Sequence, residues 1–152
     1  MVKKIDDKEA IRRLANICAK QEKSPRDILN KLHTWGFSYD ESKGILEKLQ
    51  SNDLTNDLRF ATAFVHDKLH FNKWGKRKLA FMLSQKGIAQ NIISEAIDSI
   101  ESETYESIII EELTKKNKLL KGNSQREIEI KLMKFAESRG YEFEICRKVL
   151  KG

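Results

Sequence analysis

The feature that most constrains the fold of this chain is a recurrence of apolar positions around three glycines. Gly36, Gly87 and Gly140 lie 51 and 53 residues apart. Each has apolar residues eight, seven and four positions before it, one directly after it, and an apolar pair nine and ten positions after it. Self-similarity at a fixed period is typical of stacked structural units.

Helices are the structure that this pattern favours. Apolar residues recur at spacings of three and four, no alternating strand pattern is present, and the chain has a single proline, Pro25. Serines at 24, 38 and 124 suit helix N-caps, and the three glycines suit helix ends. The β-branched run 108–110 is ambiguous alone, but its flanks favour a helix. We therefore predict nine helices, at residues 6–21, 25–35, 39–50, 56–70, 75–86, 90–101, 105–120, 125–139 and 142–151.

These helices group into three tandem three-helix repeats, and the fold class is all-α. The predicted boundaries are 1–51, 52–103 and 104–152. A unit of about 50 residues buries little surface by itself, so we expect the repeats to bury their faces against one another in an elongated, curved array. Leu32, Leu83 and Ala136 occupy the same position before each glycine and should all be buried.

Composition excludes several classes of protein. No stretch approaches the roughly 20 apolar residues of a membrane-spanning helix, and no apolar run follows the lysines of the N-terminus. Cys18 and Cys146 each fall in an apolar helical pattern, which indicates buried free thiols and a reducing, cytoplasmic setting. We therefore expect no membrane association.

Catalytic patterns are missing from the sequence. There is no glycine-rich phosphate loop, no GxSxG motif and no cysteine close to a histidine. His66 and His70 lie four residues apart, as metal ligands can, but no third ligand has a suitable spacing. We expect no metal, no cofactor and no enzymatic activity.

The basic residues are unevenly distributed. The chain has 29 Lys plus Arg against 23 Asp plus Glu, a net charge of +6, and residues 68–94 and 113–126 contain no acid. In the first of these segments Leu79, Met82 and Leu83 share a core face, with Trp74, Arg77, Lys78 and Phe81 on the opposite side. Cations interleaved with aromatics suit a binding surface. The candidate partner- or DNA-binding residues are Lys73, Trp74, Lys76, Arg77 and Lys78, with Arg59 and Lys86 as weaker members.

Two plainer interpretations of this segment stay open. A cluster of cations can be a solvated face without any partner. The aromatic residues can pack against a neighbouring repeat, because stacked helices bury two faces, and we expect this for Phe81.

The ordered motifs resemble the RecX family, whose members regulate the RecA recombinase. Residues 56–65 (NDLRFATAFV) resemble the opening of the family pattern. The stretch from Gly75-Lys76-Arg77-Lys78-Leu79 to Lys86-Gly87-Ile88 resembles its middle, and residues 24–32 with Gly36 resemble its first repeat. The likeness covers essentially the whole chain. Lys78-Leu79 stands where the family often has Arg-Ile, and Asn56 replaces one of a commonly acidic pair.

The resemblance implies a monomeric protein that lodges in the groove of a RecA–DNA nucleoprotein filament. It implies that the protein modulates the recombinase and its ATP hydrolysis by binding alone. The expected direction of this effect is inhibition. A second interpretation is direct binding to single- or double-stranded DNA without RecA, with helix 75–86 or 125–139 acting as a recognition helix.

Overall fold

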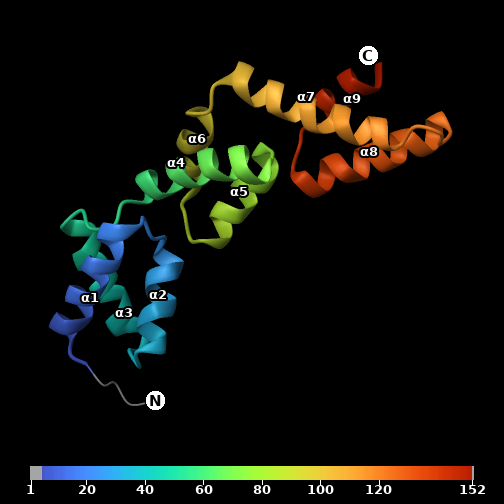
Figure 1. Cartoon of the computed structure of the whole chain (residues 1–152). Coiled ribbons are helices and arrows are strands. Elements are labelled where there is room, and N and C mark those ends of the chain that lie inside the picture. The colour runs from blue at the N-terminus through green and yellow to red at the C-terminus, as the bar shows by residue number, and fades with distance from the viewer. Residues whose placement is uncertain (1–4, 152) are drawn as a thin grey trace. The chain divides into compact units, whose positions relative to one another are not determined.

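The computed structural model describes residues 5–151, and within them the chain forms nine α-helices and no β-strand (Figure 1). The all-α prediction is therefore confirmed. The helices are α1 (Asp7–Lys20), α2 (Pro25–Thr34), α3 (Tyr39–Ser51), α4 (Asp57–Asp67), α5 (Lys76–Gln85), α6 (Gln90–Asp98), α7 (Ser102–Leu119), α8 (Gln125–Arg139) and α9 (Phe143–Lys151). A π-helical segment, η1 (Lys68–Asn72), directly continues α4.

The three serines that were predicted as N-caps each cap a helix. The Ser24 hydroxyl accepts a hydrogen bond from the backbone N–H of Asp27 (3.1 Å), and the Asp27 carboxylate accepts one from the N–H of Ser24 (3.2 Å). Ser38 and Glu41 form the same reciprocal capping box at α3. Ser124 caps α8 by accepting from the N–H of Glu127 at 3.2 Å.

The three glycines take the left-handed conformation at the ends of α2, α5 and α8. Their φ angles are 92° at Gly36, 84° at Gly87 and 80° at Gly140. A side chain disfavours this region, so glycine is the residue that ends a helix in this way at low cost. The repeated glycines thus mark three equivalent turns between helices.

Three predicted helix boundaries are wrong by three residues. The helix predicted at 90–101 ends at Asp98. The helix predicted at 56–70 leaves α-helical geometry after Asp67 and widens into η1. The helix predicted from residue 105 begins at Ser102, although Glu101 provides no side-chain cap there. The β-branched run 108–110 lies inside α7, because its helical flanks outweigh its local propensity.

The chain divides into two compact units. Unit 1 comprises Met1–Ala61 and Leu83–Ile93, and unit 2 comprises Thr62–Met82 and Ser94–Gly152. The middle predicted repeat, 52–103, contributes segments to both units, and the repeat boundaries stay a prediction.

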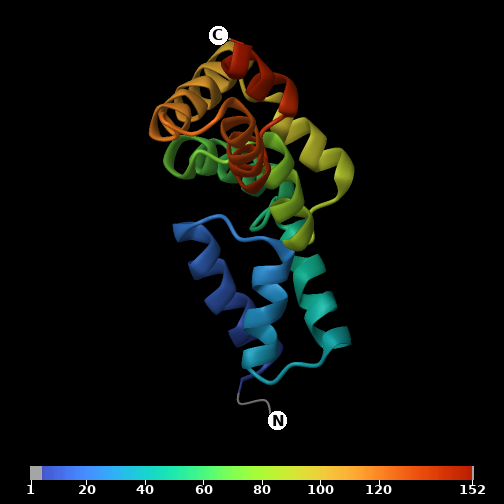
Figure 2. The same cartoon turned by 90° about the vertical axis from the view of Figure 1, so that its right-hand side faces the viewer.

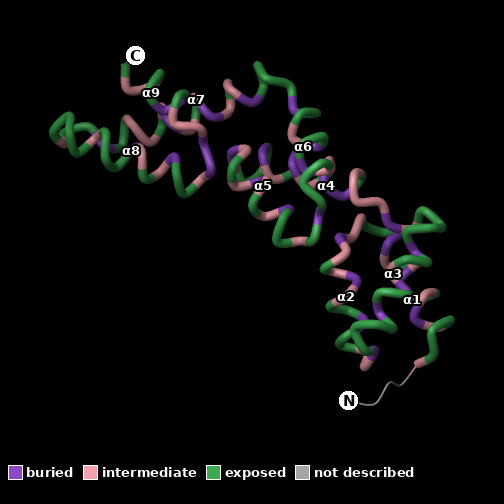
Figure 3. The backbone as a smooth tube through the Cα atoms, turned by 180° about the vertical axis from the view of Figure 1, so that it is seen from behind, coloured by how far each residue is buried: buried purple, intermediate pink, exposed green. Residues whose placement is uncertain are grey.

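Unit 1 is built on the bundle of α1, α2 and α3, which lie side by side in Figure 2. Its core is aliphatic and contains one thiol and one aromatic ring: Ala10, Leu14, Cys18, Ile28, Leu32, Phe37, Ile45 and Leu49. Figure 3 shows buried positions recurring along these helices between exposed ones, as an amphipathic pattern requires.

Unit 2 contains α7, α8 and α9, which pack against one another. Its buried residues include Leu79, Ile109, Leu113, Leu132, Ala136, Tyr141 and Cys146. Leu32 and Leu83 of unit 1 and Ala136 of unit 2 are all fully buried, so this prediction is confirmed. Cys18 and Cys146 are buried free thiols, as expected. Among the described helices, none has the length and apolar character required to cross a membrane.

Candidate partner interface

The candidate site begins with the π-helical segment η1. The N–H of Lys73 bonds to the carbonyl of Leu69 at 3.1 Å, and that of Trp74 bonds to the carbonyl of Lys68 at 3.2 Å. Lys73 ends the segment at φ 58°, an unfavourable conformation for a residue with a side chain. The widened turn and left-handed residue together redirect the chain just before α5. Isolated π turns of this kind are frequent at functional sites.

Trp74 forms the centre of a cation–aromatic cluster in unit 2. Its half-buried ring lies 6.1 Å from the ring of Phe64, measured between centroids. The ammonium of Lys78 lies 4.7 Å from the ring centre and that of Lys68 lies 5.2 Å away. Trp74 and Lys78 therefore share a face, as predicted. Lys68 was not predicted from the sequence, because it comes close to Trp74 only through the π-helical segment.

The first residues of α5 dock on the turn between α8 and α9. The N–H of Gly75 donates to the carbonyl of Arg139 at 2.7 Å, and that of Arg77 donates to the carbonyl of Gly140 at 3.1 Å. The N–H of Lys76 donates to the Tyr105 hydroxyl at 2.9 Å. These bonds satisfy donors that an isolated helix would leave to water.

The docking leaves no room for side chains at the two contacting glycines. A Cβ atom at Gly75 would lie 2.4 Å from the carbonyl oxygen of Gly140. A Cβ atom at Gly140 would lie 2.3 Å from the backbone nitrogen of Lys78. Gly140 therefore serves both the left-handed turn and the close approach of two backbones.

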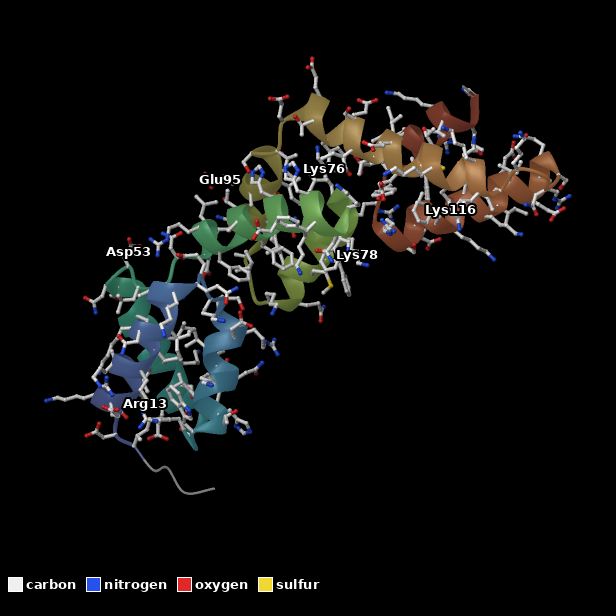
Figure 4. All side chains as sticks on the ribbon, viewed as in Figure 1. Arg13, Asp53, Lys76, Lys78, Glu95 and Lys116 are labelled. Carbon is white, nitrogen blue, oxygen red and sulfur yellow. The ribbon has the colours of Figure 1, made fainter. Side chains whose placement is uncertain are left out.

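Two more of the predicted cations lie over aromatic rings. The Lys76 ammonium is 4.6 Å from the centre of the Tyr105 ring, and the Arg77 guanidinium is 5.5 Å from that of Phe143. Within the described residues, no ion pair includes Lys73, Lys76, Arg77 or Lys78. Figure 4 labels Lys76 and Lys78 on α5. The cluster therefore keeps its positive charge without a carboxylate partner.

The hydroxyls of two buried tyrosines, Tyr105 and Tyr141, stabilise this arrangement through hydrogen bonds. Tyr105 donates to the carboxylate of Glu142 at 2.5 Å, and Tyr141 donates to the carbonyl of Lys73. Burial raises the pKa of Tyr105 far above its ordinary value, and the bond to Glu142 acts in the same direction. Burial also raises the pKa of Tyr141, to about 12. Both hydroxyls are therefore neutral donors at physiological pH.

Arg59 and Lys86, the weaker predicted members, belong to unit 1 and have carboxylate partners. Arg59 pairs with Asp53 at 2.9 Å and with Glu22 at 3.1 Å. Lys86 pairs with Asp27 at 3.1 Å. The structure thus places Lys78 over Trp74, Lys76 over Tyr105 and Arg77 over Phe143 in unit 2. Arg59 and Lys86 have carboxylate partners in unit 1 instead.

Phe81 does not behave as expected. We expected it to pack against a neighbouring repeat, but its side chain is 61% exposed. The same sequence region presents Phe71, which is 82% exposed and which sequence analysis did not single out. Large exposed aromatic side chains of this kind often belong to binding surfaces.

The histidine pair shows no metal-binding arrangement in the described part of the chain. His66 Nε2 lies 3.2 Å from the hydroxyl of Ser99. No group of three or more His, Cys, Asp or Glu side chains among the described residues could hold a metal ion.

Comparison of the chain with known proteins identifies its family. A family model described as "RecX, second three-helix domain" matches residues 56–97, which include η1, Trp74 and α5. The "Regulatory protein RecX" of Chlorobium phaeobacteroides is 31% identical over 145 residues, covering 95% of this chain and 93% of that relative. The chain belongs to the RecX family.

Other RecX proteins agree with this assignment. The "Regulatory protein RecX" of Clostridium perfringens (strain 13 / Type A) is 26% identical over 134 residues, which cover 87% of this chain. The match covers only 62% of the length of that relative. A solved structure, "Crystal structure of regulatory protein RecX", superimposes with a TM-score of 0.85 at 20% identity. It covers 96% of this chain and 72% of that one and supports the all-helical fold.

Proposed function

We propose that this chain is a regulator of the RecA recombinase that acts by binding RecA–DNA filaments. The observation that carries the proposal is the cation–aromatic cluster of unit 2. Its positive charges have no carboxylate partner within the described residues, and four of them, Lys68, Lys76, Arg77 and Lys78, are held over aromatic rings. The relatives named regulatory proteins, and the RecA partner that the family resemblance implies, give the cluster its proposed target.

The cluster suits a polyanionic surface for a physical reason. A lysine or arginine held over an aromatic ring has fewer conformations to lose when it meets a phosphate or a carboxylate. Counterion release then contributes to the affinity for DNA phosphates. The arrangement requires no cofactor and no catalytic group, so the proposed mode of action is binding alone. The proposal places the protein where the filaments form, in the cytoplasm, with inhibition as the expected direction.

Neutralising two of the cations tests this proposal. Lys73→Gln together with Arg77→Gln should weaken co-sedimentation with RecA filaments on single-stranded DNA by at least about fivefold at physiological salt. The melting temperature should change little, because neither side chain forms an ion pair among the described residues.

The matched control removes the same charge from unit 1. Lys20 and Lys48 are exposed residues near the ends of α1 and α3. Lys20→Gln with Lys48→Gln should bind filaments like the parent. Equal binding by both double variants would show that the cluster is only a solvated face.

A second candidate function is DNA binding without RecA. The exposed rings of Phe71 and Phe81 favour it, because exposed aromatics beside cations can stack on the bases of single strands. This candidate requires tight binding to naked DNA, whereas the first requires the filament. Titrating salt with naked DNA and with filaments distinguishes the two.

A further inference from the structure

Unit 1 has a groove between α2 and α3, two helices that lie side by side in Figure 2. Its volume is about 310 Å³, at the lower end of the range for sites that hold one small molecule. The groove belongs to unit 1, whereas the cation–aromatic cluster belongs to unit 2. Its lining residues include Arg26, Leu29, Asn30 and His33 of α2, and Tyr39 and Ser42 of α3.

Two cations and an uncharged donor lie along this groove. Arg26 is exposed, and no ion pair among the described residues includes it. The side-chain amide of Asn30 has no hydrogen-bond partner in this part of the chain. The Lys43 ammonium lies 5.6 Å from the centre of the Tyr39 ring, so it adds positive charge beside that ring. The protein itself leaves the donors of Arg26 and Asn30 unused.

The acidic residues near the groove in sequence do not line it. Asp27 pairs with Lys86 at 3.1 Å, and Glu41 accepts a hydrogen bond from the N–H of Ser38 at 2.9 Å. Asp40 is exposed and is not among the lining residues. Because cations lie along the groove and no carboxylate lines it, its electrostatic environment favours an anionic ligand.

Ser42 gives an independent indication of a ligand. It lines the groove, yet the residue is only 3% exposed. Its hydroxyl forms no hydrogen bond with any residue that the structure describes. Buried hydroxyls are normally paired, because water no longer satisfies them. A ligand with acceptor oxygens in the groove supplies the partner that this hydroxyl lacks.

Helical spacing separates the two ends of the groove. Arg26 and Asn30 lie one turn apart on α2, and His33 lies about one turn further on the same face. At 1.5 Å per residue, this face is about 10 Å long, which is close to the length of one nucleotide. After the short connection 35–38, α3 runs back along α2, so Tyr39 lies at the His33 end and Ser42 lies further towards Arg26. Hydrogen-bond donors thus gather at one end and rings at the other.

We propose that this groove binds a free nucleoside phosphate. The Arg26 guanidinium, the Asn30 amide and the Ser42 hydroxyl donate hydrogen bonds to phosphate oxygens, and the guanidinium matches the phosphate with two parallel bonds. The base lies against Leu29 and extends towards His33, where apolar and aromatic surface replaces the donors. The site goes beyond the proposed filament contact and uses none of the residues of the unit 2 cluster.

Isothermal titration calorimetry of the full chain with ADP, in the absence of RecA and DNA, tests the proposal. We expect saturable binding of one ADP per chain with a Kd below about 1 mM. Adenosine lacks the phosphates and inorganic pyrophosphate lacks the base, so each should bind at least about tenfold more weakly than ADP. The proposal is wrong if ADP does not saturate the protein in this range, or if either fragment binds as tightly as ADP.

Two conservative substitutions assign the binding to this groove. Ser42→Ala and Arg26→Lys should each weaken ADP binding by at least about fivefold, because the first removes a donor and the second keeps the charge but loses the paired hydrogen bonds. Ser42→Ala should leave the melting temperature unchanged or raise it, since the hydroxyl has no partner in the free protein. Ser107→Ala and Arg147→Lys change exposed residues of unit 2 in the same way and should bind ADP like the parent. ADP binding at parental strength by Ser42→Ala or by Arg26→Lys would contradict the proposal.

Competition separates a free nucleotide from a nucleotide within a DNA strand. A short thymidine oligonucleotide should not displace ADP, because the groove has room for one nucleotide only. If the oligonucleotide displaces ADP and Ser42→Ala weakens both ligands equally, the groove is a contact for single-stranded DNA and the proposal is overturned. Since the calorimetry contains neither RecA nor DNA, a failure to bind ADP would overturn this proposal and leave the function proposed for the unit 2 cluster unaffected.

Discussion

Single residues in this chain perform two tasks at once, and Gly140 is the clearest case. It takes a left-handed φ of 80° at the end of α8, and its backbone lies against Lys78 so closely that a Cβ would meet the nitrogen at 2.3 Å. Gly44, inside α3, carries neither demand, because a Cβ there meets nothing within 4 Å. The two glycines therefore invite opposite predictions.

Gly140→Ala should destabilise the protein, because the left-handed backbone and the clash with α5 both oppose a side chain. We expect a loss of about 2–4 kcal/mol in the free energy of unfolding. Gly44→Ala should raise it by about 0.5–1 kcal/mol, since alanine is favoured in a helix interior. Urea unfolding followed by circular dichroism measures both changes. A neutral Gly140→Ala variant would contradict the docking described for unit 2.

At the scale of elements, the α5 start is held in place by groups from α7 and from the turn before α9. Tyr105 lies on α7, and Tyr141 lies in the turn after Gly140. The Tyr105 hydroxyl accepts from the N–H of Lys76, and the Tyr141 hydroxyl donates to the carbonyl of Lys73. Tyr105 therefore supplies a side-chain cap to a helix whose preceding residue, Gly75, has no side chain. Tertiary contacts replace the usual local cap here.

This arrangement predicts a dependence of stability on alkaline pH. The pKa of Tyr141 is raised from about 10 to about 12 in the folded protein, because its phenol is buried. An unfolded phenol ionises at lower pH, so the stabilisation from Tyr141 is complete below pH 10 and is lost as pH rises towards 12. Tyr141→Phe should lower the melting temperature at pH 8 but show a shallower decline between pH 10 and pH 12. A decline as steep as that of the parent would mean that Tyr141 does not contribute to it.

At the scale of the whole molecule, the net charge of +6 is less informative than the way in which cations are paired. Arg59 and Lys86 face carboxylates, whereas Lys76, Arg77 and Lys78 face aromatic rings. Cations without acidic partners are the ones that can neutralise phosphates without first breaking an ion pair.

Salt titration measures how many of these cations meet DNA. We expect between two and four phosphate contacts from the four basic residues Lys73, Lys76, Arg77 and Lys78. A plot of the logarithm of the affinity for filament-bound single strands against the logarithm of the salt concentration should then have a slope of about −1.4 to −2.8. Lys73→Gln with Arg77→Gln should reduce the magnitude of that slope by about 1.4. An unchanged slope would place the DNA contact elsewhere. Naked DNA bound as tightly as filaments would favour the second candidate function.

Much of the fold was predictable from the sequence because its signals are local. A capping serine, a glycine that ends a helix and an apolar period of three to four residues each act within one or two turns of the chain. These signals correctly predicted the helices that begin at Pro25 and Tyr39, the three left-handed turns, and the burial of Leu32, Leu83 and Ala136.

Only the tertiary structure decided how the candidate site is assembled. The bond between Tyr141 and Lys73 joins residues 68 positions apart, and no local pattern encodes such a pairing. The sequence placed Trp74 and Lys78 on one face, but it could not show the π turn that adds Lys68, or the exposure of Phe81. Helical periodicity determines which residues share a face, whereas the packing of distant helices determines what covers that face.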